Sequence, residues 1–116
     1  MRRVSVIQAS SGVRVASKTM VADSWWGRFR GLLGRPVLGS GEGMLLLGCG
    51  SIHTVGMDHP IDIAFLDADG RVVRRLERLG PWRVGLGGPT ATHALELPAG
   101  RLEETGTAPG DRLSWS

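Results

Sequence analysis

The stretch Ile61-Asp-Ile-Ala-Phe-Leu66, Asp67-Ala-Asp-Gly70, Arg71-Val-Val-Arg-Arg-Leu76 decides the fold class of this chain. The first and third segments are short apolar or alternating runs of the kind that form strands. The four residues between them are typical of a tight turn, with glycine where a positive φ is needed. The sequence therefore predicts a β-hairpin at this place.

Further short strands are predicted on both sides of this hairpin. They are Val4–Ile7 and Val13–Val15 around a turn at 10–12, the apolar run Met44–Leu47, Thr92–Leu97, and a last strand ending at Leu113 and Trp115. Residues 80–89 hold four glycines and two prolines, which predicts a long surface loop. Residues 98–106 predict a turn with at most one helical turn.

One short amphipathic helix is expected over residues 24–33. Its apolar residues recur at steps of three and four, at Trp25, Trp26, Phe29, Leu32 and Leu33. Asp23 or Ser24 is suited to cap its start, and Gly34 with Pro36 ends it. Many short strands with one helix predict a mainly β fold, a compact antiparallel β-sandwich or partly closed barrel.

Length and composition predict an ordinary globular chain. The 116 residues suit one domain, 1–116, with 41% hydrophobic and 22% charged residues. The net charge of +3 comes from arginine, since Lys18 is the single lysine, and such a bias is as easily a matter of genome composition as of nucleic-acid binding. No membrane segment is visible. The lone cysteine, Cys49, excludes an internal disulfide and favours the cytoplasm.

Cys49 and His53 form one candidate site. A cysteine and a histidine within hydrogen-bond reach make a thiolate nucleophile with its base. Four residues of extended strand span about 13 Å, so the two side chains meet only if the chain turns at Gly50. The alternative is a buried thiol beside a hydrogen-bonded histidine.

Two acidic residues stand inside apolar runs, where a carboxylate needs a partner. Asp62 lies between two isoleucines, and Glu96 lies between two leucines. Backbone N–H groups or an arginine such as Arg83 would satisfy Asp62; alternatively, both carboxylates line one pocket. Trp82 next to Arg83 offers a stacking surface and a charged fork for an anionic or polar ligand.

Metal and nucleic-acid binding receive less support. The possible metal ligands are Cys49, His53, His59, His93, Asp62 and Glu96. Their spacings match no dense ligand motif, so no metal is predicted. The arginines of residues 71–78 are typical of a solvated face, because exposed aromatic residues are not interleaved with them.

Several motifs together resemble a known family. They are S-I-H-T-x-G-M-x-x-P-I-D-I-x-F-L-D at 51–67, P-W-R at 81–83, L-E-L-P-A-G at 95–100, G-D-x-L at 110–113 and R-G-L-L-G-R at 30–35. They resemble the conserved prokaryotic family catalogued as domain of unknown function 192. The resemblance implies a compact β-rich domain with a sandwich or barrel-like core and no established activity. Relatives in this family are often exported, which weighs against a cytoplasmic location.

Two functional hypotheses follow. The first is a non-catalytic module that binds a small molecule or a protein partner, with ligand contacts from His53, Met57, Asp62, Trp82, Arg83 and Glu96. The second is an enzyme with Cys49 as nucleophile and His53 as base, or with a metal held by His53 and nearby carboxylates. The residues specify neither the ligand or cofactor nor the oligomeric state.

Overall fold

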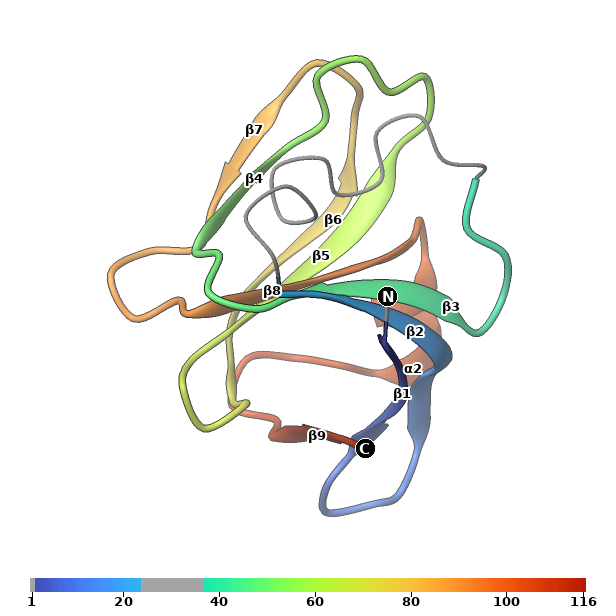
Figure 1. Ribbon diagram of the computed structural model, residues 1–116, viewed down its shortest axis with the longest axis vertical. Coiled ribbons are helices and arrows are strands. Elements are labelled where there is room, and N and C mark those ends of the chain that lie inside the picture. The colour runs from blue at the N-terminus through green and yellow to red at the C-terminus, as the bar shows by residue number, and fades with distance from the viewer. Residues whose placement is uncertain (1, 24–36) are drawn as a thin grey trace.

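The computed structural model describes residues 2–23 and 37–116 (Figure 1). The helix predicted over 24–33 lies outside these residues. The described elements are β1 Arg2–Gln8, β2 Arg14–Ala22, β3 Glu42–Leu46, β4 Ser51–His53, β5 Ile61–Leu66, β6 Val72–Leu79, β7 Val84–Leu86, β8 His93–Pro98, α2 Arg101–Thr105 and β9 Leu113–Trp115. The predicted mainly β fold is confirmed.

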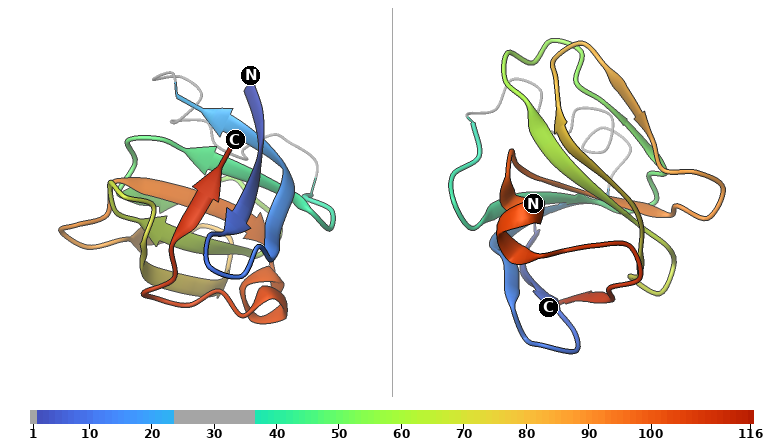
Figure 2. Two further views of the ribbon diagram at one scale, coloured as in Figure 1. Left: turned by 90° about the horizontal axis from the view of Figure 1, so that it is seen from below. Right: turned by 180° about the vertical axis from the view of Figure 1, so that it is seen from behind.

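Seven strands form one curled sheet in the order β6-β5-β8-β3-β2-β1-β9, and β4 with β7 forms a second, small sheet (Figures 1 and 2). The large sheet nearly closes on itself, because an isolated bridge joins Arg71 to Arg112. Strands β2 and β3 run parallel, whereas every other described pair is antiparallel. This parallel pair is an exception in a sheet that is otherwise antiparallel as expected, and residues 23–41 between its strands are long enough for the crossover that parallel strands need.

The hairpin that decided the fold class is confirmed as β5 and β6. Its turn is built by Asp67, whose Oδ1 accepts hydrogen bonds from the backbone N–H groups of Asp69 and Arg71, both at 2.9 Å. Gly70 has φ 84°, and a Cβ there would lie 2.5 Å from the carbonyl oxygen of Leu113. The glycine is therefore required both by its conformation and by the strand that passes beside it.

The predicted long loop over 80–89 contains a strand, which corrects that prediction. Residues 84–86 form β7 and pair with β4. At its centre, a Cβ on Gly85 would lie 2.9 Å from Leu76 Cδ1. The small sheet thus packs directly on β6, and a larger residue at position 85 would have to displace the Leu76 side chain.

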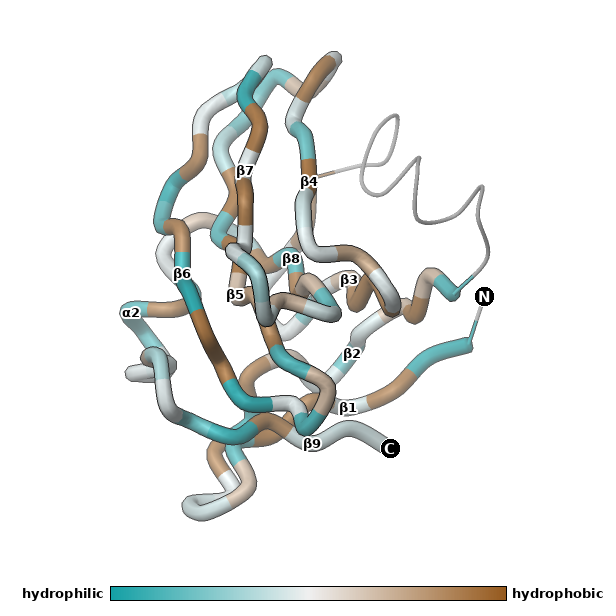
Figure 3. Tube along the Cα trace, turned by 90° about the vertical axis from the view of Figure 1, so that its left-hand side faces the viewer, coloured by the Kyte–Doolittle hydropathy of each residue, from teal (hydrophilic) through white to brown (hydrophobic). Residues whose placement is uncertain are grey.

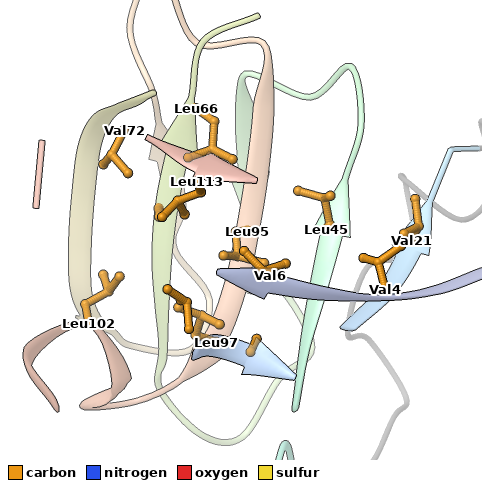
Figure 4. Close-up of a cluster of buried hydrophobic side chains, with 13 residues drawn as sticks. Val4, Val6, Val21, Leu45, Leu66, Val72, Leu95, Leu97, Leu102 and Leu113 are labelled. Carbon is orange, nitrogen blue, oxygen red and sulfur yellow. The ribbon is translucent and has the colours of Figure 1, made fainter. Parts of the chain in front are cut away.

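The two faces of the large sheet carry separate cores. The concave face encloses the first cluster, which includes Leu66, Leu95 and Leu97 and is covered by β1, β9 and α2 (Figure 4). The other face carries the second cluster, which includes Met44, Ile63 and Phe65 and lies beneath the small sheet. Since successive side chains on a strand point to opposite faces, each central strand contributes to both clusters.

Candidate functional site

Glu96 lies in the middle of the large sheet with its side chain on the face of the second cluster. It pairs with Met44 on one side and Ile63 on the other, and it is 2% exposed. Among the described residues its Oε1 atom has no hydrogen-bond partner. Burial raises the pKa of Glu96 to about 8. Near neutral pH the group is therefore mostly an uncharged acid, able to donate one hydrogen bond.

Asp62 lies on the opposite face, and its carboxylate is fully engaged by the backbone. Its Oδ1 accepts from the N–H of Arg78 at 2.8 Å, and its Oδ2 accepts from Gly100 at 3.1 Å and Leu102 at 2.9 Å. Asp62 therefore fixes the start of α2 to the end of β6. The expectation that Asp62 and Glu96 line one pocket is corrected, because the sheet separates them.

Trp82 and Arg83 are held beside β4 by Thr54, a residue that sequence reasoning missed. The N–H of Trp82 donates to Thr54 O at 3.0 Å, and the N–H of Thr54 donates to Arg83 O at 2.8 Å. The Thr54 hydroxyl accepts from Arg83 N–H at 2.9 Å and donates to Gly80 O at 2.6 Å. The motif S-I-H-T contains this threonine, but only the fold shows which loop it fastens.

Strand β7 of the small sheet is largely hydrophobic (Figure 3), and apolar residues on the outer side of this sheet are exposed. His53 pairs with Val84, and Ser51 pairs with Leu86. Val84 is 64% exposed, Leu86 62% and Trp82 69%. We call the residues Ser51, His53, Trp82, Arg83, Val84 and Leu86 the small-sheet surface. In the sequence, the apolar residues Val84 and Leu86 alternate with Gly85, which is a pattern of strands. Three residues are too few to predict a strand from that pattern.

Cys49 and Met57 do not belong to this surface. Cys49 precedes β4 and packs against the second cluster, and Met57 is buried in that cluster. The extended strand 51–53 then places His53 on the outer side, where its Nδ1 accepts a hydrogen bond from the Val55 N–H at 3.3 Å. This course of the chain favours a packed thiol over a nucleophile with its base.

The other two histidines each have a polar partner within hydrogen-bond distance. His59 lies with Nδ1 2.9 Å from Asp58 Oδ1. His93 accepts a hydrogen bond from the Gly48 N–H at 3.0 Å, and burial lowers its pKa. Within residues 2–23 and 37–116, no three His, Cys, Asp or Glu side chains gather closely enough to hold a metal ion.

One groove is lined in part by His59, a possible metal ligand, and by none of the predicted ligand-binding residues. It has a volume of about 310 Å³ and is lined by Val37, Leu38, His59, Pro60, Ile61, Pro98 and Ala99. No helix in the described part of the chain has the length and apolar character to cross a bilayer.

Comparison with known proteins places the chain in a family. The sequence profile of domain of unknown function 192, described as "Uncharacterized ACR", matches residues 6–115. The chain belongs to this family. A UPF0127 protein from Thermococcus sibiricus is 30% identical over 114 residues, which cover 95% of this chain and 73% of that protein.

Two solved structures share the fold. A protein of unknown function from Novosphingobium aromaticivorans has a TM-score of 0.83 at 24% identity, covering 97% of this chain and 84% of its own. A Sinorhizobium meliloti protein, described as a "putative transcription regulator", also has a TM-score of 0.83, at 27% identity, covering 97% of this chain and 92% of its own. The first of these likenesses concerns the fold alone. Membership of domain of unknown function 192 therefore confirms the resemblance and leaves the activity to be argued from the site.

Proposed function

We propose that this member of domain of unknown function 192 is a non-catalytic binding module whose binding element is the small-sheet surface. The observation that carries the proposal is the conformation of Trp82, which has φ 60° while its side chain is 69% exposed. A bulky residue at positive φ costs about 1–2 kcal/mol. An exposed indole recovers little of that cost by burial, so selection for folding alone does not account for it.

The hydrogen bonds of Thr54 hold Trp82 in this conformation. Both the N–H and the hydroxyl of Thr54 bond to Arg83, the next residue. A backbone segment that is fixed before binding loses little conformational entropy when a partner covers it. Tryptophan and arginine are also the residues that most often dominate binding energy at protein surfaces. The fixed Trp82-Arg83 pair is suited to that role.

The remaining predicted residues support the proposal less directly. Glu96 and Met57 lie beneath the small sheet and would meet a ligand only from the side of the second cluster. The enzyme alternative, with Cys49 and His53, has less support because Cys49 packs against the second cluster, whereas His53 ends the extended strand β4 on the outer side of the small sheet. We also propose a cytoplasmic location, for which the single cysteine is the supporting observation.

A thermal-shift screen tests the binding module. The native protein is screened against a panel of anionic and polar small molecules and short peptides. Compounds that raise its melting temperature are then tested on Trp82→Ala and Arg83→Ala. We expect both variants to fold and to lose the stabilisation. Val13→Ala is the matched control, since Val13 is 43% exposed and lies in the turn before β2. Stabilisation that persists in both surface variants would refute the assigned surface.

A further inference from the structure

Strand β7 has an edge that no other described strand covers. The small sheet contains only β4 and β7. The N–H of Thr54 donates to Arg83 O at 2.8 Å, and the N–H of Gly87 donates to Gly50 O at 2.9 Å. These two hydrogen bonds flank the strand pair, so they fix which residues of β7 direct their backbone groups toward β4.

The pattern leaves Val84 and Leu86 facing outward. Antiparallel pairs alternate between residues that exchange both hydrogen bonds and residues that exchange none. The flanking bonds place Gly85 and its partner Ile52 in the bonded pair. The N–H and C=O groups of Val84 and Leu86 therefore point to the open edge. The C=O of Leu86 accepts from Arg74 Nη1 at 2.9 Å, whereas the other three groups have no partner within the described residues.

The edge of the large sheet at β6 carries several charged residues, whereas β7 has no charged residue of its own. Exposed edges are usually blunted by charged residues or bulges that prevent pairing with another chain. Strand β6, at one end of the large sheet, carries Arg74, Arg75, Glu77 and Arg78 and two irregularities of register. Strand β7 contains only valine, glycine and leucine, and the valine and leucine side chains are exposed.

Each end of this edge has a positively charged residue. Arg83 precedes β7, and the Arg74 guanidinium lies at its far end on Leu86 O. Residues 80–86 contain no acid. Neither arginine takes part in an ion pair in the described part of the chain. A guanidinium has five N–H donors, so Arg74 is able to keep its bond to Leu86 and still bind a carboxylate.

We propose that β7 accepts an extended acidic polypeptide segment as an additional strand. The main chain of the segment pairs with Val84 and Leu86, its carboxylates meet Arg74 and Arg83, and its apolar side chains contact Trp82. This inference rests on the proposed binding function and names its partner. Unsatisfied backbone groups in a row require an extended partner, and the two arginines require negative charge.

The probe is a fluorescein-labelled, blocked peptide of about nine residues, longer than β7, in which glutamate and valine alternate. The same peptide with lysine in place of glutamate is the charge control. Fluorescence anisotropy is measured with the native protein and with variants. We expect the acidic peptide to bind more weakly as ionic strength rises, and the lysine peptide not to bind.

Val84→Pro is the deciding variant, because proline removes only an N–H that points away from β4 and is tolerated on edge strands. We expect it to raise the Kd by about tenfold, the effect of losing one hydrogen bond and the strand pairing around it. Val84→Thr keeps the N–H and should stay within about twofold. Arg74→Gln and Arg83→Gln should each raise the Kd severalfold.

Several results would overturn the proposal. The first is that the acidic peptide does not bind the native protein. The second is that Val84→Pro binds the peptide with native affinity. The third is a concentration-dependent dimer that Val84→Pro abolishes, which would assign the edge to a second copy of the chain. If Val84→Pro does not fold, amide exchange of Val84 and Leu86 in the native protein decides: the peptide must slow it. The two proposals can also fail separately. If Val84→Pro binds the peptide with native affinity but the screened compounds still depend on Trp82 for binding, the proposed binding surface stands and only strand addition is refuted.

Discussion

Asp62 and Glu96 occupy paired strands, β5 and β8, yet their side chains point to opposite faces of the large sheet. Asp62 pairs with Leu97, and Glu96 pairs with Ile63. This offset of one residue gives the two acids opposite surroundings. Asp62 meets three backbone N–H groups, whereas Glu96 meets apolar side chains. Backbone donors thus hold the Asp62 side chain, whereas burial raises the pKa of Glu96.

The contribution of Glu96 to the stability of the protein should fall as the pH rises from about 5 to 8. Unfolded Glu96 ionises near its ordinary pKa of 4.5, but in the folded protein its pKa is about 8. Between these values the folded state binds up to one more proton than the unfolded state. The free energy of unfolding then decreases by up to about 1.4 kcal/mol per pH unit from this group. Urea denaturation across this pH range measures the slope.

Glu96→Gln is the control for that slope, because glutamine has the same shape and does not ionise. The variant should match the native protein near pH 4 and be the more stable of the two above about pH 7. The two proteins have every other titrating group in common. The difference between their free energies of unfolding at each pH therefore reports the ionisation of Glu96 alone. Parallel stability profiles would mean that Glu96 ionises in the folded state as it does in the unfolded chain.

Asp62→Ala should destabilise the protein by at least about 2 kcal/mol. The change leaves the N–H groups of Arg78, Gly100 and Leu102 without their acceptor, and each buried donor without a partner costs about 1–3 kcal/mol. Asp58→Ala is the matched control, since the Asp58 side chain is 95% exposed; it should change stability by less than about 0.5 kcal/mol. Equal midpoints for the two variants in urea would contradict the role given to Asp62.

Trp82→Gly should be at least as stable as the native protein, and its free energy of unfolding should exceed that of Trp82→Ala by about 1 kcal/mol. Glycine adopts positive φ without the steric cost that alanine and tryptophan carry. Both variants remove the same indole, so their difference in thermal unfolding reports the backbone alone. A more stable alanine variant would show that the backbone at this position is not strained.

Gly87→Ala should cost about 1–3 kcal/mol by overpacking. A Cβ at Gly87 would lie 2.5 Å from Ala91 Cβ and 2.6 Å from Phe65 Cδ1, within the second cluster. Gly80→Ala is the control, because nothing lies within 4 Å of its Cβ and its φ is not positive. Calorimetry should separate the two variants by several degrees.

Local patterns predicted the hairpins well, and long-range relationships were harder to predict. The turn at Asp67–Gly70 specifies β5 and β6 through contacts within a few residues. The parallel pairing of β2 with β3 and the strand β7 depend on segments far apart in the sequence. Gly85 interrupts the apolar run of β7, and the reason for that glycine, its contact with Leu76, is visible only once the sheets are packed.

The candidate site was predicted in part for the same reason. Polar residues in apolar runs marked Asp62 and Glu96 correctly as buried, but alternation along each strand does not reveal the register between strands. The position of Trp82 beside β4 depends on Thr54, which hydrogen-bonds to Arg83 across a separation of 29 residues. Sequence spacing alone contains no measure of such a bridge.

The segment 78–83 is clamped at both ends. Asp62 binds the N–H of Arg78, and Thr54 binds Gly80 and Arg83. Among the described residues, both non-glycine residues with positive φ, Arg78 and Trp82, belong to this segment. The two sets of hydrogen bonds fix the length of this segment. Inserting or deleting one residue would break one of them or move the Trp82 indole away from its position. Relatives that conserve both anchors should therefore conserve the length of this segment, even where its amino-acid sequence differs.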